Sequence, residues 1–377
     1  MNKERVVVVA SEMVTPYGWG VEACWKGLFS KKTAVSRLKR FSTKAFQSDY
    51  AGTVKGLEYH RKESLVIQMI EGLFKKAPVK IPEGTRLILA TAKGEVDLLE
   101  KQLINGKDNV SGTLLNSLVK KVSGIFGMSE NGAAVLSAAC VSSTAAVAKA
   151  AGVIRSKRAD SVMVVTCDSV TEFVFSGFSS LMALDKNCAK PFDKKRNGLT
   201  LGEAAAFILV MSESKARREG REIFGEVAGW GLSNDANHMT GPSRDGSGLT
   251  RAIKKALQKA DINEKTIGSI SSHGTGTIYN DAMEMKAFRT IFGNNRRPVY
   301  SIKGGIGHSM GAAGLVEMII ALRTLRSGIS PPTVNLNEVD EDARGWVSPF
   351  ESSLDKYKMV LSTNSGFGGV NAALVLA

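Results

Sequence analysis

The sequence is poor in the residues that hold small extracellular or metal-dependent folds together. It contains four cysteines, Cys24, Cys140, Cys167 and Cys188, and no two of them form a C-x-x-C pair. This spacing disfavours a disulfide framework and a zinc site, so we expect no bound metal and a reduced, cytoplasmic environment. The 9 prolines and 7% aromatic residues also exclude a proline-rich linker protein and an aromatic nucleic-acid surface.

Long hydrophobic runs are missing as well. The best candidate, residues 138–154, is interrupted by three hydroxyl residues and by Lys149, and it cannot span a bilayer. The apolar run from Val6 to Ala10 is too short for a signal peptide, and we expect it to form a buried strand. The sequence therefore predicts a protein that does not enter a membrane.

What the chain does have is an ordinary globular composition with an excess of positive charge. Of its 377 residues 43% are hydrophobic and 23% are charged, and the net charge is +14. A basic surface raises the encounter rate with anionic partners, such as nucleic acid, an acidic carrier protein or a phosphate-bearing substrate. The basic groups are not interleaved with aromatics, and no known nucleic-acid motif accompanies them, so we do not expect nucleic acid as a partner.

Short β-branched runs alternate with longer amphipathic segments, which predicts layered α/β architecture. We expect strands at 5–10, 86–90, 133–137, 161–166, 205–210, 223–230, 269–272, 298–302, 359–363 and 372–375. We expect helices at 21–28, 65–75, 142–156, 212–219, 248–260, 281–292 and 311–325. The charged segment 212–220 predicts a boundary between an N-terminal half, 1–220, and a C-terminal half, 221–377. Each half contains a β-run, a small-residue turn and an Ala/Gly-rich helix, which hints at internal duplication.

Cys140 is the candidate nucleophile. It follows a predicted strand, opens a predicted helix and has small neighbours that would let a substrate reach the sulfur. A cysteine at a helix N-terminus meets free N–H groups and the positive end of the helix dipole, which stabilise a thiolate. A buried structural cysteine is the commoner fate of a free thiol, so the position alone leaves both interpretations open.

His273 lies in the run S-H-G-T-G-T, directly after a predicted strand. Asp281 and Glu284 on the next predicted helix could anchor or orient this loop. Alone, His273 would be an ordinary loop histidine, and the two acidic residues are equally explained as the acidic start of a helix.

His308 stands in a second glycine-rich loop, K-G-G-I-G-H-S-M-G-A-A-G, whose glycines allow close approach of a backbone or a ligand. Lys303 begins this run, and its positive charge would disfavour imidazolium and keep His308 neutral. Glu317 on the following helix could pair with Lys303. An ordinary surface ion pair is the alternative.

The same loop contains G-H-S-M-G, which matches the G-x-S-x-G turn of α/β-hydrolases. That fold needs a histidine after the serine in the chain, and none of His60, His238, His273 and His308 lies beyond Ser309. Chain order therefore excludes a serine hydrolase. A dinucleotide-binding loop is disfavoured too, because no acidic residue follows at a suitable distance on a second strand.

A last glycine-rich turn, residues 364–371, lies between two predicted strands near the C-terminus. Its backbone N–H groups could bind an anion or an oxyanion, and a plain hairpin turn is the alternative.

Taken together, these segments resemble the β-ketoacyl-[acyl carrier protein] synthases of the long-chain elongating type, in order and over essentially the whole chain. The motifs that carry the resemblance are A-C-x-S-S around Cys140, P-F-D-K-K-R-N-G at 191–198, G-E-A-A at 202–205, H-G-T-G-T at 273–277, Lys303 with G-H at 307–308 and G-A-A-G at 311–314, and N-S-G-F-G-G at 364–369.

The resemblance implies a thiolase-like, duplicated five-layer αβαβα fold and a homodimer, with a heterodimer as the alternative. It implies that Cys140 takes an acyl chain from an acyl carrier protein thioester. His273 and His308 would bind the carbonyl of the malonyl thioester and promote loss of carbon dioxide, and the resulting carbanion would attack the acyl-enzyme. A thiolate suits this exchange because it is both nucleophile and leaving group, and paired imidazoles suit an enolate.

The resemblance also implies supporting roles. The N–H groups of Cys140 and Phe367 would form an oxyanion hole, and Phe367 would gate entry. Lys303 and Glu317 match the family's supporting pair. Thr275, Thr277 and Asp281 are expected to support the loop of His273. No cofactor and no metal are needed for this chemistry.

The chain departs from the family pattern at several places. Asn197 stands where the family usually has Asp, Ala204 where it has Gly, and Ser365 where a second Phe is common. Residues 166–168 replace a Gly-rich strand end, and the chain is shorter than usual between residues 50 and 86. These changes leave the nucleophile and the histidines intact. A synthase for a polyketide, a polyene or an unusual lipid is consistent with them.

Two alternatives stay open. A biosynthetic thiolase uses a second cysteine in a C-terminal Gly-rich turn, and G-F-G at 366–368 contains none. A non-catalytic chain-length partner of a heterodimeric synthase typically lacks the nucleophile, whereas Cys140 is present.

Overall fold

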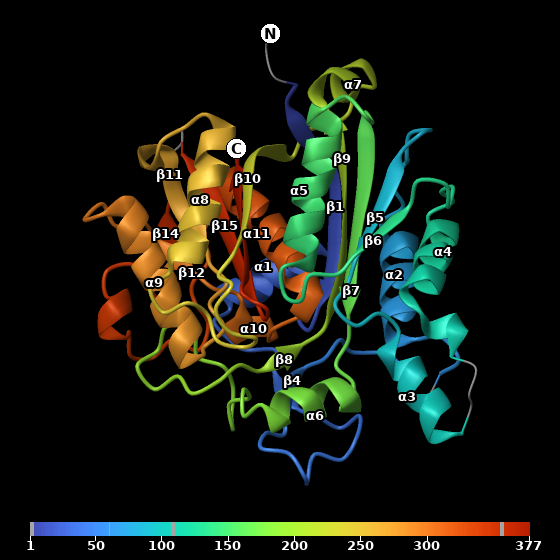
Figure 1. Cartoon of the computed structure of the whole chain (residues 1–377), viewed down its shortest axis with the longest axis horizontal. Helices are drawn as coiled ribbons and strands as arrows, with labels where there is room; N and C mark the ends of the chain where they lie inside the picture. Colours follow the sequence, from blue (N-terminus) through green and yellow to red (C-terminus); the bar gives the residue numbers. More distant parts are fainter. Residues whose placement is uncertain (1–3, 60, 107–109, 355–357) are drawn as a thin grey trace.

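A mixed sheet of eleven strands runs through the whole molecule (Figure 1). The computed structural model describes residues 4–59, 61–106, 110–354 and 358–377. The strands lie in the order β12-β11-β15-β16-β10-β1-β9-β7-β5-β6, with β2 paired to β1. The two halves of the sheet meet where β1 (Val6–Thr15) pairs antiparallel with β10 (Gly225–Asn234). The layered α/β prediction is confirmed.

The two halves of the sheet have the same topology. The first half contains β1, β5 (Arg86–Ala90), β6 (Ala134–Leu136), β7 (Ser161–Asp168) and β9 (Ala204–Ser212). The second contains β10, β11 (Ile267–Ser271), β12 (Val299–Tyr300), β15 (Met359–Gly366) and β16 (Val370–Leu376). In each half the third strand lies at the edge, followed by the second, fourth, fifth and first. In each half the second strand pairs parallel with the third and fourth, and the fifth runs antiparallel. This identity of order and direction confirms the duplication.

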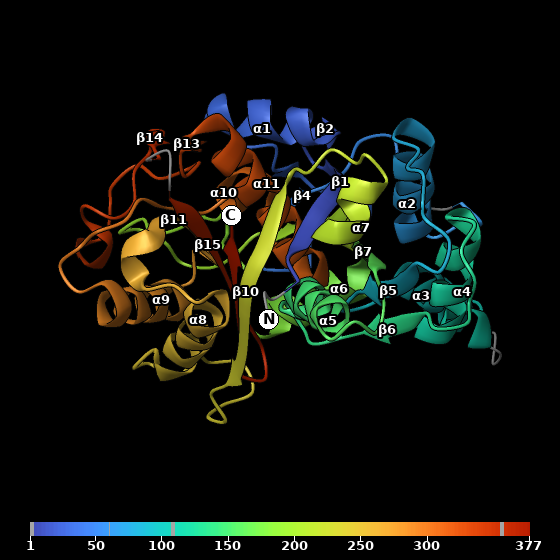
Figure 2. The same cartoon turned by 90° about the horizontal axis from the view of Figure 1, so that it is seen from above.

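Helices cover both faces of each half-sheet and so create five layers (Figures 1 and 2). The central layer holds α5 (Ser142–Arg155), α11 (Ala313–Ser327) and α1 (Val21–Phe29), which share one apolar core with inner-face residues of both half-sheets. A second core packs the outer face of the first half against α2 (Leu65–Lys76) and α4 (Leu115–Ile125). A third packs the second half against α8 (Ser247–Ala260) and α9 (Ile278–Phe292).

The period of two along the strands explains why helices are needed on both sides. In β9, Ala206, Ile208 and Val210 face the central core. Their neighbours Phe207 and Leu209 face the outer core. A strand that is apolar on both faces cannot leave either face to water, so the continuous apolar runs of the sequence predict this burial.

Further elements surround this framework. They are α3 (Val96–Ile104), α6 (Glu172–Ser180), α7 (Glu213–Arg218), α10 (Lys303–Ile306), β2 (Gly18–Trp19), β3 (Ser36–Arg37), β4 (Tyr50–Gly52), β8 (Leu201–Gly202), β13 (Ile329–Ser330), β14 (Ser352–Ser353) and four 3₁₀ turns at Ser111–Thr113, Glu264–Thr266, Met310–Ala312 and Glu341–Ala343. Within the described ranges, none of the helices combines the length and the apolar composition needed to cross a bilayer.

The parallel strands bring their carboxyl ends together at one edge of the molecule, and the candidate residues follow those ends. In the first half the loop after β5, Cys140 after β6 and the end of β7 meet there. In the second half the loop after β11, the segment after β12 and the turn after β15 occupy the same positions. We propose that the halves divide at residues 220 and 221, in the connection from α7 to β10.

Candidate active site

A cavity of about 910 Å³ opens at this edge and takes its walls from both halves of the chain. Cys140 reaches it from the first half, and His273, His308 and Phe367 reach it from the second. Thr275 and Thr277 line it as well. Lys303, Glu317 and Asp281 are almost wholly buried and stand behind its wall. The structure thus brings together every residue that the sequence singled out.

Cys140 is held in a tight turn between β6 and α5. Ala139, just before it, has a φ of 48°, which is rare for a residue with a side chain. Ser142 secures the turn, because its hydroxyl donates to the carbonyl of Ala139 (2.6 Å) and accepts the N–H of Ala138 (2.8 Å). The turn therefore fixes the thiol at the helix N-terminus with 8% of the residue exposed.

Burial, and not the helix, decides the protonation state of this thiol. Desolvation raises the pKa of Cys140 to about 11, although the charge of Lys303 and the N–H of Phe367 act in the opposite direction. The sequence-based expectation of a stabilised thiolate is therefore wrong for the free protein. Near neutral pH Cys140 is a thiol that must lose its proton when it reacts.

The glycine-rich turn between β15 and β16 lies against this cysteine. The N–H of Phe367 donates toward the sulfur of Cys140. A Cβ atom at Gly366 would lie 3.2 Å from the backbone nitrogen of Cys140, so a larger residue would crowd the two N–H groups. The ring of Phe367 stacks on Phe178 of α6, with 5.7 Å between centroids. The turn is thus a hairpin turn, and it also supplies the N–H that faces the nucleophile.

His273 and His308 stand edge to face, with ring centroids 5.1 Å apart and planes at 87°. Burial lowers the pKa of both rings well below the usual value, and the charge of Lys303 lowers it further. Both imidazoles are therefore neutral near physiological pH. A neutral imidazole can donate one hydrogen bond without carrying a positive charge into the cavity.

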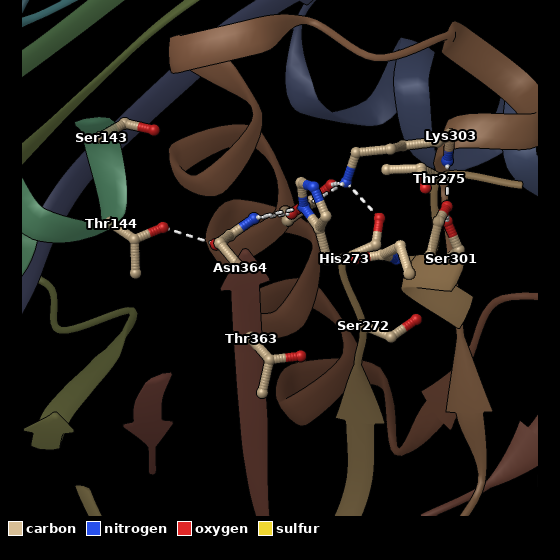
Figure 3. A network of polar contacts seen from close by, with 12 residues as sticks. Ser143, Thr144, Ser272, His273, Thr275, Ser301, Lys303, Thr363 and Asn364 are labelled. Atoms are coloured by element: carbon tan, nitrogen blue, oxygen red, sulfur yellow. Dashed lines mark hydrogen bonds and ion pairs between the residues drawn. The ribbon is translucent and has the colours of Figure 1, made fainter. Parts of the chain in front are cut away.

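The contacts of His273 define which ring nitrogen carries the proton. Its Nδ1 lies 3.3 Å from Nζ of Lys303 and 3.4 Å from Nδ2 of Asn364 (Figure 3). Both neighbours are donors, so Nδ1 must be the acceptor. The proton consequently resides on Nε2.

Lys303 is the hub of this buried network. Its ammonium group donates to Oε1 of Glu317 and to the backbone carbonyl of His273. Oε2 of Glu317 accepts a 2.6 Å bond from Nδ2 of Asn364. A buried charge is tolerated only when it is paired and hydrogen-bonded, and both charges meet this condition here.

Two carboxylates hold the His273 loop from the other side. Glu284 accepts the N–H of His273 (2.8 Å) and of Gly274 (2.7 Å). Asp281 accepts the N–H of Thr275 (3.1 Å). Burial, and next the nearby Asp281, raise the pKa of Glu284 to about 7. The acidic residues of this helix therefore anchor the loop and do not merely complement the helix dipole.

Asp168 is a functional neighbour that the sequence did not identify as such. Its carboxylate, wholly buried at the end of β7, accepts the hydroxyl of Thr91 (2.9 Å) and the N–H groups of Ala92, Lys93 and Gly311. Burial raises its pKa to about 6. Gly311 belongs to the turn after His308, so this carboxylate ties the two halves together beneath the site. The available signal was a charged residue that closes an otherwise apolar strand.

The comparisons with known proteins agree with this geometry. Residues 3–96 and 93–216 match the model of the β-ketoacyl synthase N-terminal domain, and residues 224–337 match that of the C-terminal domain. The chain is 30% identical to 3-oxoacyl-[acyl-carrier-protein] synthase 2 of Vibrio cholerae over 412 residues, which cover 100% of this chain and 99% of that relative. It is also 30% identical to the tetracenomycin polyketide synthase ketoacyl synthase alpha subunit of Streptomyces glaucescens, over 100% of this chain and 97% of that one.

Solved structures give the same result. The ishigamide ketosynthase/chain length factor superimposes with a TM-score of 0.90 at 29% identity and covers 100% of this chain and 99% of its own. A type II polyketide ketosynthase solved with its acyl-carrier protein has a TM-score of 0.89 at 26% identity, over 100% of this chain and 99% of its own. On the family models and these relatives together, the chain belongs to the β-ketoacyl synthase family.

Proposed function

We propose that this chain catalyses the decarboxylative Claisen condensation of an acyl group held on Cys140 with a malonyl thioester on an acyl carrier protein. One observation carries the proposal: a thiol and two neutral imidazoles, supplied by different halves of the chain, line one cavity. A nucleophile that is also a good leaving group and a pair of uncharged donors are what the two steps of this reaction require.

In the first step the sulfur of Cys140 attacks the carbonyl carbon of the acyl thioester, and the carrier thiol leaves with the proton that Cys140 gives up. The negative charge that develops on the carbonyl oxygen needs preorganised donors. The N–H groups of Cys140 and Phe367, which lie on facing turns, are placed to supply them. Phe367, stacked on Phe178 beside the cavity, would have to move as an acyl chain enters.

In the second step a malonyl thioester occupies the cavity with its thioester oxygen between His273 and His308. Nε2–H of His273 donates to this oxygen, and His308 donates from the other side. As the C–C bond to the carboxylate breaks, its electron pair forms the enolate that these donors stabilise, and carbon dioxide leaves. The enolate carbon then attacks the acyl-enzyme carbonyl and expels the thiolate of Cys140.

Lys303 supports this step without reaching the substrate. Burial keeps the pKa of both histidines low, and the charge of Lys303 lowers it further, so that both remain neutral donors. Glu317 balances that charge, and Asp281 fixes the loop that carries Thr275 and Thr277. The two threonine hydroxyls, 2.9 Å apart on the cavity wall, are placed to meet the arm of the incoming thioester.

An acyl carrier protein is the proposed partner, and its acidic surface would complement the net charge of +14. We further propose that the protein works as a dimer, as a homodimer or with a chain-length partner. The departures at Asn197 and Ser365, which both line the cavity, support a specialised polyketide, polyene or lipid substrate. The enzyme would act in the cytoplasm.

The test is condensation by the purified chain with a panel of acyl carrier protein thioesters and malonyl carrier protein. We expect β-ketoacyl carrier protein and carbon dioxide in equal amounts, and a rate that falls as salt increases. Labelling with iodoacetamide at a pH of about 10, where more of the buried thiol is ionised, should mark Cys140. Modification confined to the other cysteines, or no product with any acyl group, would exclude a synthase and leave a non-catalytic chain-length partner.

A further inference from the structure

We propose that Thr144 is a positioning residue that holds the amide of Asn364 in the orientation required by His273 and Glu317, and thereby couples the helix of the nucleophile to the histidine pair. This inference rests on the proposed function only for its consequence in catalysis. The contacts themselves are a property of the free protein.

Thr144 lies in the first turn of α5, four residues after Cys140, and its hydroxyl donates to Oδ1 of Asn364 (Figure 3). Both side chains are wholly buried. Because Oδ1 is taken by the hydroxyl of Thr144, the NH₂ group of the amide must point the opposite way, toward Oε2 of Glu317 (2.6 Å) and Nδ1 of His273 (3.4 Å). The carboxylate of Glu317 can only accept, so it favours this orientation of the amide, and the hydroxyl of Thr144 supports it by pairing the amide oxygen across the two halves.

The opposite orientation would damage the site. It would place the amide oxygen against the carboxylate of Glu317, where two acceptors repel each other, and against Nδ1 of His273, where an acceptor favours a proton on Nδ1. The proton on Nε2, the atom that donates to the thioester oxygen, would then be favoured by the ammonium of Lys303 alone. Without the hydroxyl of Thr144, the amide oxygen is also left buried without its partner, which destabilises the observed orientation.

A glycine on α11 leaves the space that the contact between Thr144 and Asn364 occupies. A Cβ atom at Gly314, the last residue of the G-A-A-G segment and the second of α11, would lie 1.9 Å from the hydroxyl oxygen of Thr144 and 2.9 Å from Oδ1 of Asn364. Any side chain at this position would therefore displace the hydroxyl or the amide. The absence of a side chain at Gly314 lets α5 and α11 approach closely enough for the bond.

Ser143, the neighbour of Thr144 on the same helix, provides a matched control. Its hydroxyl also bridges the halves, because it accepts the N–H of Leu315 (3.0 Å), yet in Figure 3 it lies apart from Asn364 and no bond is drawn between the two. Loss of this hydroxyl removes one cross-half hydrogen bond without touching the amide. A purely structural role for Thr144 would make the two losses alike.

The experiment compares Thr144→Val, Thr144→Ser, Gly314→Ala and Ser143→Ala with the wild-type chain by ¹⁵N NMR of the histidine rings, which is practical because the chain has only four histidines. We expect wild type, Thr144→Ser and Ser143→Ala to show His273 with its proton on Nε2. In Thr144→Val and Gly314→Ala the Nδ1 signal should move toward a mixture of tautomers. Identical His273 signals in wild type and Thr144→Val would overturn the inference.

The same proteins are then assayed separately for acylation of Cys140 and for carbon dioxide release from malonyl carrier protein. Thr144→Val should keep acylation but lose about tenfold in carbon dioxide release, since the affected hydrogen bond serves only the second step. Thr144→Ser should release carbon dioxide at close to the wild-type rate. Equal losses of acylation and of carbon dioxide release in Thr144→Val would contradict the inference. A wild-type chain that releases no carbon dioxide would refute the proposed function, whereas the His273 signals would still test the role of Thr144.

Discussion

The two halves of the molecule have the same strand order but carry different functional side chains at equivalent positions. After the third strand, the first half places Cys140, and the second half places Lys303 and His308. After the second strand, one half has the Thr91 loop and the other has His273. The duplicated scaffold therefore offers the same set of strand ends twice. In the proposed mechanism, side chains alone make one half hold the acyl group and the other half promote decarboxylation.

The fourth strand of each half, β7 in the first and β15 in the second, carries a different buried polar side chain. In the first half β7 ends in Asp168, a carboxylate that receives N–H groups from a neighbouring loop and from Gly311 of the other half. In the second half β15 carries Asn364, an amide that receives the hydroxyl of Thr144 and donates to Glu317. Both are buried polar groups that form a hydrogen bond with the other half of the chain. Each half therefore contributes one side chain that aligns it with the other half.

The largest effect is expected from removing the unique group of the first half. Cys140→Ala should abolish acyl-enzyme formation and lower condensation by about four orders of magnitude or more, because Cys140 is the one cysteine among the described residues that line the cavity. Intact-protein mass measurement after incubation with acyl carrier protein thioesters checks this. Condensation that persists in the variant would refute the division of labour.

A smaller loss is expected in the second half. His273→Ala removes one of two donors to the enolate oxygen, and carbon dioxide release should fall by about 10²–10³-fold. Acylation of Cys140 in the same protein serves as the internal control and should change by no more than about threefold, because His273 acts after that step. Parallel losses in both steps would show that the halves do not act separately.

The burial of the Cys140 thiol should be visible in the pH dependence of its alkylation. With a pKa of about 11, the thiolate fraction of Cys140 and its alkylation by iodoacetamide should rise about tenfold per pH unit between pH 7 and pH 10. Peptide mass analysis follows Cys140 separately from the other cysteines. A rate that is already level above pH 8 would mean that the helix N-terminus outweighs burial.

The smallest effect concerns one buried carboxyl group in each half, Glu284 in the second and Asp168 in the first. Glu284 has its pKa raised from 4.5 to about 7, so between these values the folded chain binds more protons than the unfolded chain, and stability falls as pH rises. The Tm advantage of wild type over Glu284→Gln should therefore shrink from pH 4.5 to pH 7. For Asp168→Asn the window should lie lower, from 3.8 to about 6. A constant difference across these ranges would contradict the assigned shifts.

Sequence patterns gave much of this framework. The strand at 86–90 and the helices beginning at 21, 65 and 142 match closely, because apolar periodicity and turn glycines determine them locally. The helices α3, α4 and α6 were missed. In α3 the buried Asp97 faces inward, so the apolar period is weak. In α6 the run of aromatic and small residues favours neither period clearly.

The sequence predicted the residues proposed to react, but not the supporting residues Asp168 and Thr144 or the electrostatics of the site. The order of the motifs was enough to predict that Cys140, His273 and His308 meet, because each follows the end of a strand, where the fold restricts its position. The hydrogen bond between Thr144 and Asn364 joins residues 220 positions apart, and the local sequence around neither residue predicts it. The raised pKa of Cys140 depends on packing from both halves, which the sequence around the cysteine does not contain.

A chase of preformed acyl-enzyme tests the central claim most directly. Wild type and His308→Ala are first acylated on Cys140 and then given malonyl carrier protein, while intact mass is followed over time. The account predicts that wild type discharges its acyl group as β-ketoacyl product, whereas His308→Ala acquires the acyl group normally and keeps it. Discharge by His308→Ala at the wild-type rate would contradict it.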